Sequence, residues 1–151
     1  MENRFFNNDG ISVTSVEWIV LTKAPVAGKV KTRLIPMLGE QGACDIYCRL
    51  LKRLQQSLRS LVLKQGGHVA LWIAGDDGHK EFKAWREFAI FYQQPQQDDL
   101  AGMDLGGRMA LAVKSTFSRG RFPILIGVDV PDLDELYLEN CLQAFSTHDL
   151  V

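Results

Sequence analysis

Basic side chains gather around a glycine in the first quarter of the chain. Lys23, Lys29, Lys31 and Arg33 fall within eleven residues, with Gly28 between them. A lysine ammonium neutralises phosphate as a point charge, an arginine guanidinium can hold two phosphate oxygens, and a glycine lets backbone N–H groups approach an anion. The stretch predicts a loop that binds the phosphates of a nucleotide or nucleotide-sugar. The alternative is a solvated basic loop with no ligand.

Two better-known phosphate-binding loops do not fit this stretch. A Walker A loop would have glycine at the position of Lys23. It would also have Ser or Thr after the lysine, whereas Val30 follows Lys29. A dinucleotide-binding fingerprint needs Gly-x-Gly directly after the first strand, and that pattern is absent. The basic loop is therefore of a different type.

Two carboxylates follow the apolar run at residues 123–128. Oxygen ligands of this kind suit Mg²⁺ or Mn²⁺ bridging a diphosphate. Asp129 is predicted to be a metal ligand because it stands where the run stops, whereas Asp132 is predicted only to cap the following helix.

The elements that would carry these residues alternate along the chain. Short apolar, β-branched runs predict strands at residues 16–21, 68–74, 88–92 and 123–128. Apolar residues at spacings of three and four predict a long helix with a stripe over residues 43–61, stopped at Gly66, and shorter helices at 79–87, 104–117 and 133–145.

Alternation of strands and helices predicts an α/β fold, with a mostly parallel sheet and helices on both faces. We expect one domain over residues 16–151, after a flexible tail at 1–15, with the strands in the order 3-2-1-4. Ligands of such sheets bind outside the carboxyl ends of the strands, at the point where the strand order reverses. The loop after Lys23 and the turn at Asp129 should therefore share one sheet edge.

Three motifs, in this order, resemble one bacterial family. Lys-Ala-Pro-x-x-Gly-x-x-Lys-Thr-Arg-Leu-x-Pro-x-Leu-Gly covers residues 23–39, Asp-Leu-Gly-x-Arg-Met covers 104–109, and Ile-Gly-x-Asp-x-Pro-Asp-Leu covers 126–133. They are similar to the glycosyltransferase-A-like family of uncharacterised transferases sometimes called selenodomain-associated transferase 1. The resemblance runs from about Val16 to the C-terminus.

The resemblance implies a nucleotide-diphospho-sugar transferase (GT-A) like fold, a nucleotide or nucleotide-sugar ligand, and Mg²⁺ or Mn²⁺ held at Asp129. Glycosyl transfer is favoured; the alternatives are nucleotidyl transfer of the guanylyltransferase type and a non-catalytic nucleotide-binding domain. No catalytic residue is predicted. The residues implied in nucleotide binding are Lys23, Ala24, Pro25, Gly28, Lys31, Thr32, Arg33, Asp104, Gly106 and Arg108.

The chain departs from the family pattern at two places and in its length. Ala27 stands where the family often has Gly or Pro, and Val130 stands where it often has Cys or Ile. Family members continue past the position of residue 151 into a Gly-Pro segment and an Asp-Gly-Gly-Tyr motif. A sheet shortened in this way predicts a homodimer or an aggregation-prone monomer, and nucleotide binding without efficient turnover.

Composition bounds the partners and the compartment. The 151 residues are 46% hydrophobic and 23% charged with a net charge of −1, so no overall field draws the chain to nucleic acid or an anionic membrane. Three cysteines form no disulfide scaffold and suggest a reducing compartment. No apolar run is long enough to span a bilayer. The chain is predicted to be cytoplasmic.

Overall fold

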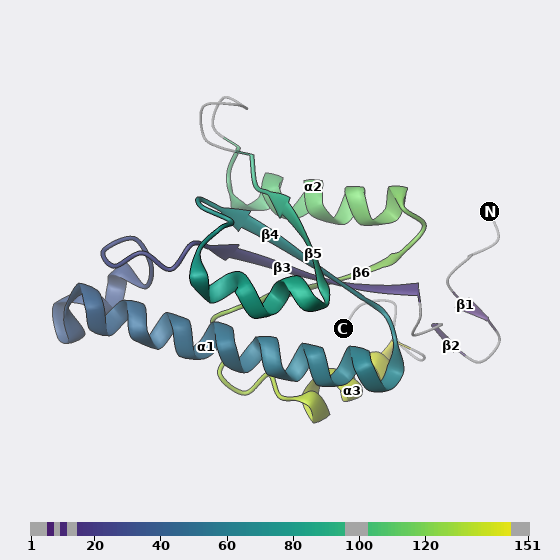
Figure 1. Cartoon of the computed structure of the whole chain (residues 1–151). Helices are drawn as coiled ribbons and strands as arrows, with labels where there is room; N and C mark the ends of the chain where they lie inside the picture. The colour runs from purple at the N-terminus through teal and green to yellow at the C-terminus, as the bar shows by residue number, and fades with distance from the viewer. Residues whose placement is uncertain (1–5, 8–9, 12–14, 96–102, 146–151) are drawn as a thin grey trace.

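The computed structural model describes residues 6–7, 10–11, 15–95 and 103–145 (Figure 1). The predicted tail at 1–15 lies mostly outside these residues, and within it β1 and β2 form an antiparallel pair. The elements in chain order are β1 (Phe6–Asn7), β2 (Gly10–Ile11), β3 (Val16–Lys23), η2 (Thr32–Leu34), α1 (Ile35–Gln65), β4 (His68–Ala74), η3 (Lys80–Glu87), β5 (Ala89–Gln93), α2 (Leu105–Ser118), β6 (Phe122–Gly127) and α3 (Glu135–Ala144).

Four strands form one parallel sheet in the order β5-β4-β3-β6, which confirms the predicted order 3-2-1-4. β3 is central, and Val16, Ile19 and Val20 are fully buried in it. α1, η3 and α3 cover one face of the sheet and α2 covers the other (Figure 1). The four strands lie within two residues of their predicted bounds, because short apolar runs of this kind can be buried on both faces.

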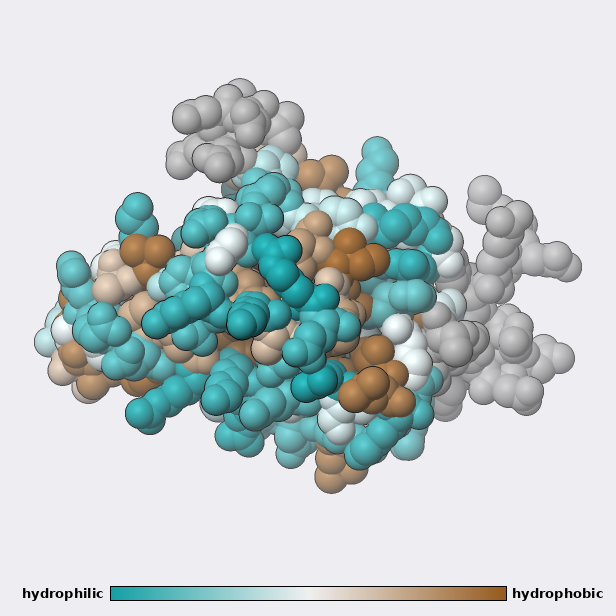
Figure 2. All heavy atoms as spheres, viewed as in Figure 1, coloured by the Kyte–Doolittle hydropathy of each residue, from teal (hydrophilic) through white to brown (hydrophobic). Residues whose placement is uncertain are grey.

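α1 carries the predicted apolar stripe, and its outer side is polar. Arg49, Lys52 and Arg53 are exposed on it, and the face seen in Figure 2 is mostly hydrophilic, with hydrophobic side chains in small separate groups. The helix begins at Ile35, earlier than predicted, but Gly39 has φ 71° and ψ 170° and interrupts it. The buried side chains of α1 are Ala43, Cys44, Tyr47, Leu51, Leu54, Gln55, Leu58 and Leu61.

The predicted helix caps are partly wrong. Asp132 does not cap the last helix: α3 begins at Glu135, and Asp134 Oδ1 accepts a hydrogen bond from Tyr137 N at 2.8 Å. The Asp132 carbonyl instead accepts from Asp134 N, which makes the turn that leads into the helix. The helix expected at 79–87 is a 3-10 helix, and the side chain of His79 accepts from Glu81 N at its start.

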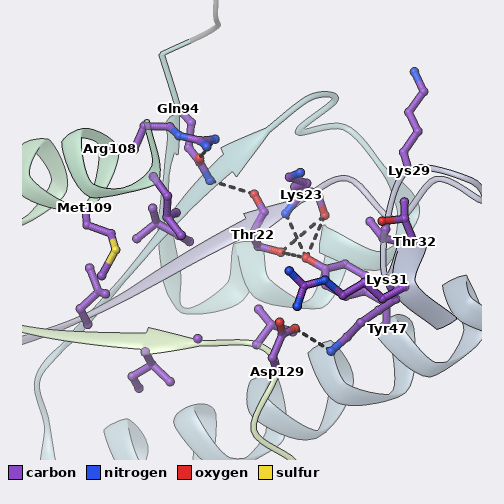
Figure 3. Close-up of a pocket in the computed structure, with 18 of the residues that line it drawn as sticks. Thr22, Lys23, Lys29, Lys31, Thr32, Tyr47, Gln94, Arg108, Met109 and Asp129 are labelled. Carbon is purple, nitrogen blue, oxygen red and sulfur yellow. Dashed lines mark hydrogen bonds and ion pairs between the residues drawn. The ribbon is translucent and has the colours of Figure 1, made fainter. Parts of the chain in front are cut away.

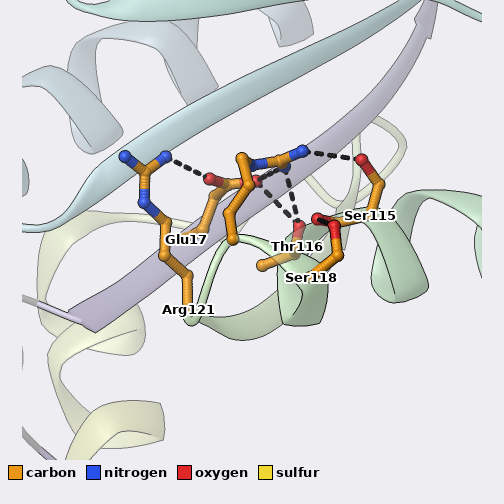
Figure 4. Close-up of polar contacts among 6 residues, drawn as sticks. Glu17, Ser115, Thr116, Ser118 and Arg121 are labelled. Atoms are coloured by element: carbon orange, nitrogen blue, oxygen red, sulfur yellow. Dashed lines mark hydrogen bonds and ion pairs between the residues drawn. The ribbon is translucent and has the colours of Figure 1, made fainter.

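A buried carboxylate lies at the amino end of the central strand, inside a run that is otherwise apolar. Glu17 is fully buried and forms ion pairs with Arg119 and with Arg121, the latter at 2.6 Å (Figure 4). The Thr116 hydroxyl donates to the same carboxylate at 2.7 Å. Burial alone would raise the pKa of Glu17, but the hydrogen bonds from the two arginines and from Thr116 outweigh it and lower the pKa from its ordinary 4.5. Glu17 therefore ties the sheet to the end of α2 and the start of β6.

We predict that Glu17→Gln lowers the free energy of unfolding by about 3 kcal/mol, the lower end of the range for breaking a buried ion pair. The value is at the lower end because both arginines are about a quarter exposed, at 24% and 23%. Urea unfolding at pH 7 measures the change. Glu87→Gln is the control, because its ion pair with Arg59 is exposed and should contribute less than about 1 kcal/mol. Equal effects of the two substitutions would contradict the prediction.

The same carboxylate predicts a pH dependence. Because the folded pKa of Glu17 lies below its ordinary value of 4.5, its contribution is fully present above that pH and is lost as the pH falls through the lowered pKa. The difference in stability between wild type and Glu17→Gln should therefore shrink in acid below pH 4.5. Unfolding curves collected between pH 7 and pH 3 test this, and a constant difference would contradict it.

Candidate functional site

The basic loop leaves the carboxyl end of β3 through a series of tight turns. Ala24 N donates to Ala74 O of β4 at 2.9 Å, and Lys29 N donates to Val26 O at 2.9 Å. Gly28 has φ 80°, and a Cβ there would come within 3.2 Å of the Glu40 carboxylate, so both the backbone and the space favour glycine. The turns fold the loop back over the start of α1.

A cavity of about 810 Å³ opens at the carboxyl edge of the sheet, between the basic loop, α2 and the turn after β6 (Figure 3). One part of its wall is cationic and another is apolar. Its lining residues are Leu21, Thr22, Lys23, Lys29, Val30, Lys31, Thr32, Arg33, Leu34, Tyr47, Gln94, Leu105, Arg108, Met109, Leu125, Ile126, Gly127, Val128 and Asp129.

The two loops singled out in the sequence meet directly across this cavity. Lys31 Nζ lies 2.8 Å from Asp129 Oδ1, with side chains that are 19% and 73% exposed (Figure 3). Lys31 has φ 49°, in the left-handed region, a conformation that costs a non-glycine residue roughly 1 kcal/mol. The ion pair thus joins the predicted phosphate loop to the predicted metal ligand.

Tyr47 of α1 holds the point at which β3 becomes the loop. Its hydroxyl lies 2.7 Å from Thr22 Oγ1, accepts from Lys23 N at 3.0 Å and donates to Lys23 O at 3.3 Å. Burial, and to a smaller degree the charge of Asp129, raises the pKa of Tyr47 above its ordinary 10.0. The phenol is therefore protonated at neutral pH and acts as a hydrogen-bonding anchor for the strand end.

Gln94 anchors the other side of the cavity. Its Nε2 donates to Thr22 O at 2.9 Å and to Trp72 O at 2.8 Å, which ties the ends of β3 and β4 together. Its Oε1 accepts from Arg108 Nη1 of α2 at 3.1 Å. Because both amide protons are used on carbonyls, the amide oxygen is held toward Arg108 and the cavity (Figure 3).

The structure brings some of the predicted site residues to the cavity and leaves others behind it. Lys23, Lys31, Thr32, Arg33, Arg108 and Asp129 line it. Ala24 and Pro25 are buried in the loop, and Gly28 forms its turn. Asp104 caps α2, because its side chain accepts from Gly107 N at 2.8 Å, and Gly106 is exposed in the first turn of that helix. The residues Ala24, Pro25, Gly28, Asp104 and Gly106 therefore shape the elements rather than the cavity wall.

Three polar lining residues are absent from the set predicted from the sequence: Thr22, Tyr47 and Gln94. Tyr47 belongs to the apolar stripe of α1, and its spacing there predicts a packing residue. Gln94 stands in the polar stretch after β5, and a polar residue at the carboxyl end of a parallel strand was the available signal. Thr22, the last buried residue of β3, gave a similar but weaker signal.

The donor set offers one carboxylate to a divalent cation. Asp129 is the acidic residue among the lining residues, and the described residues contain no group of three His, Cys, Asp or Glu placed to hold a metal ion. Mg²⁺ is commonly held by one or two protein carboxylates, with phosphate oxygens and water as its other ligands. The site fits a cation that a bound phosphate helps to coordinate.

The sheet and the helices around it have a nucleotide-diphospho-sugar transferase-like fold, as a comparison with solved structures shows. The crystal structure of a protein from Desulfovibrio desulfuricans G20, provisionally described as a nucleotide-diphospho-sugar transferase, is similar to it, with a TM-score of 0.58 and 25% sequence identity. The similarity covers 84% of this chain and 53% of that chain, so this chain spans about half the length of the protein it matches.

The chain belongs to a conserved bacterial family described as "Uncharacterized protein conserved in bacteria (DUF2064)", whose model matches residues 57–151. The match begins within α1 and takes in α2 and Asp129, while the basic loop precedes it. No curated protein matches the chain. Within the described residues, no helix is long and apolar enough to cross a membrane.

We predict that Gln94→Met lowers the free energy of unfolding by about 1–3 kcal/mol, because two carbonyl oxygens at the ends of β3 and β4 lose their amide donor. Chemical denaturation measures the change. Gln56→Met is the control, because Gln56 is exposed on α1. A Gln94 variant as stable as the control would show that the amide does not hold the two strand ends together.

Proposed function

We propose that the cavity binds the diphosphate of a nucleotide-sugar and that the chain is part of a transferase, with glycosyl transfer as the favoured reaction. The observation that carries this proposal is the charge of the cavity wall. The lining residues include five cations and one carboxylate: Lys23, Lys29, Lys31, Arg33 and Arg108, and Asp129. A wall of this kind suits a ligand with several negative charges.

The two parts of the cavity wall suit the two parts of such a ligand. The cations of the basic loop would bind the phosphates, and the apolar side chains of Leu105 and Met109, beside the amide of Gln94, would face the base and ribose. In glycosyl transfer the diphosphate is the leaving group and gains charge in the transition state. Fixed cations next to it would stabilise that charge without reorganising.

We also propose that Asp129 binds Mg²⁺ or Mn²⁺ together with the ligand phosphates. A divalent cation there would act as a Lewis acid toward the leaving diphosphate. The protein's own part is to hold the phosphates with Lys31 and Arg33, while Asp129 would hold the cation.

The similarity to the D. desulfuricans protein supports a transferase, and it covers about half of that protein, 53% of its chain. Two alternatives follow from the same cavity: nucleotidyl transfer of the guanylyltransferase type, and nucleotide binding without efficient turnover. The product separates them. Release of a nucleoside diphosphate from a nucleotide-sugar indicates glycosyl transfer, and release of pyrophosphate from a nucleoside triphosphate indicates nucleotidyl transfer. A cytoplasmic location and a homodimer stay predictions.

Thermal shift with a panel of nucleoside diphosphates and nucleotide-sugars, each with and without Mn²⁺, finds the ligand, since a ligand of the native state raises its stability in proportion to the logarithm of concentration over Kd. For the ligand found, we predict that Arg33→Ala weakens binding by about 1.5–3 kcal/mol, roughly 10- to 150-fold in Kd, as expected for a charged hydrogen bond. The stability of the unliganded protein should barely change.

Arg53→Ala is the matched control, because Arg53 is exposed on α1 and does not line the cavity. Isothermal titration calorimetry of the two variants compares them directly. If the Arg33 variant binds as tightly as the Arg53 variant, the basic loop is a solvated surface and the proposed function loses its support.

A further inference from the structure

The ion pair between Lys31 and Asp129 occupies two groups that a phosphate ligand and a cation would each need. The Lys31 side chain is mostly buried, with 19% of it exposed, and its ammonium contacts the carboxylate at 2.8 Å. Asp129 is 73% exposed at the mouth of the turn after β6. A phosphate that pairs with Lys31 must therefore either displace Asp129 or share with it the ammonium, which has three donors.

The charge balance makes both arrangements unfavourable for a free anion. Asp129 is the carboxylate among the lining residues, so a diphosphate that takes Lys31 leaves an unpaired negative charge beside its own oxygens. Like charges a few ångströms apart repel, and the repulsion is stronger inside a cavity than in bulk water. This repulsion would cancel part of the binding free energy that a free diphosphate gains from Lys31.

A diphosphate that carries a divalent cation does not meet this cost. One protein carboxylate is a weak site for a resident cation, since no further His, Cys, Asp or Glu in the described residues completes a group of three with it. The same carboxylate can serve as one added ligand to a cation that phosphate oxygens already chelate. Phosphate then pairs with Lys31, the cation pairs with Asp129, and one ion pair is replaced by two.

We propose that the Lys31–Asp129 ion pair makes the cavity selective for a diphosphate that arrives as its complex with Mg²⁺ or Mn²⁺, and discriminates against the free anion. The inference rests on the proposed function and narrows it, because it names the form of the substrate that the site accepts. Asp129 acts here as a competitor of phosphate for Lys31 until a cation engages it.

Removing the competitor should reverse the selectivity. In Asp129→Asn the amide no longer neutralises Lys31, so free diphosphate should bind more tightly than to wild type, by roughly 1.5- to 5-fold, the range expected from the loss of an exposed ion pair. The same variant should lose the gain in affinity that Mg²⁺ gives the wild type. Lys31→Met should weaken binding of both forms, because the phosphate loses its partner in either case.

The experiment titrates wild type and both variants with pyrophosphate by isothermal titration calorimetry, once in EDTA and once in excess Mg²⁺. Asp132→Asn is the matched control: it lies three residues along the same turn, is exposed, and does not line the cavity. A second measurement uses Mn²⁺ alone and follows its electron paramagnetic resonance signal. We expect no binding of Mn²⁺ without pyrophosphate, and binding when pyrophosphate is added.

Two results would overturn the inference. Weaker binding of metal-free pyrophosphate by Asp129→Asn would show that the carboxylate positions Lys31 for phosphate rather than competing with it. Tight binding of Mn²⁺ alone would show a resident cation site. Failure of the proposed function looks different: wild type would bind pyrophosphate in neither form, whereas in the two cases above wild type binds it and only the role of the ion pair is wrong.

Discussion

The parallel pairing of β3 with both of its neighbours is the constraint on which the site depends. β3 pairs with β4 over residues 17–23 and with β6 over residues 16–21, and Leu21 lies opposite Gly127 in that register. Neighbouring parallel strands end at the same edge of the sheet, so the segments that follow β3 and β6 begin next to each other there. The 2.8 Å contact between Lys31 and Asp129 is the direct result. A slip of one residue in this register would turn the side chains of β6 to the other face of the sheet and move the turn that carries Asp129.

The two ends of β3 are held in different ways. At its amino end a buried side chain, Glu17, is neutralised by two arginines from the turn between α2 and β6. At its carboxyl end the side chains of Tyr47 and Gln94 bind main-chain atoms of Thr22 and Lys23. Charge fixes one end, and neutral hydrogen bonds fix the other. The bonds from Tyr47 and Gln94 that hold the carboxyl end of β3 therefore use no cationic side chain of the basic loop.

Most of the fold could be predicted from the sequence, because short apolar runs and a 3.6-residue stripe are local signals. The strand order also followed, since crossover connections leave few arrangements open. The basic loop and Asp129 could be named from residue type and from their place after strands, and the structure puts Lys31, Arg33 and Asp129 on one cavity wall. The contacts of Gln94, Tyr47 and Glu17 could not be recognised, because their partners lie 14 to 104 residues away in the chain. The cap was misplaced from Asp134 to Asp132 because both aspartates precede the helix and only the backbone geometry separates them.

Gly39 separates the end of the basic loop from the long part of α1. The residue breaks the helical conformation with φ 71° and ψ 170°, so the turn at residues 35–38 continues the basic loop rather than the long helix. The long part of α1 is fastened to the core by Tyr47, Leu51 and Leu58, all buried. The basic loop is itself fastened to the core by Ala24 and Val30, both buried. Gly39 therefore lets the chain change direction at one pair of dihedral angles, so that the loop can line the cavity while the long helix packs against the sheet.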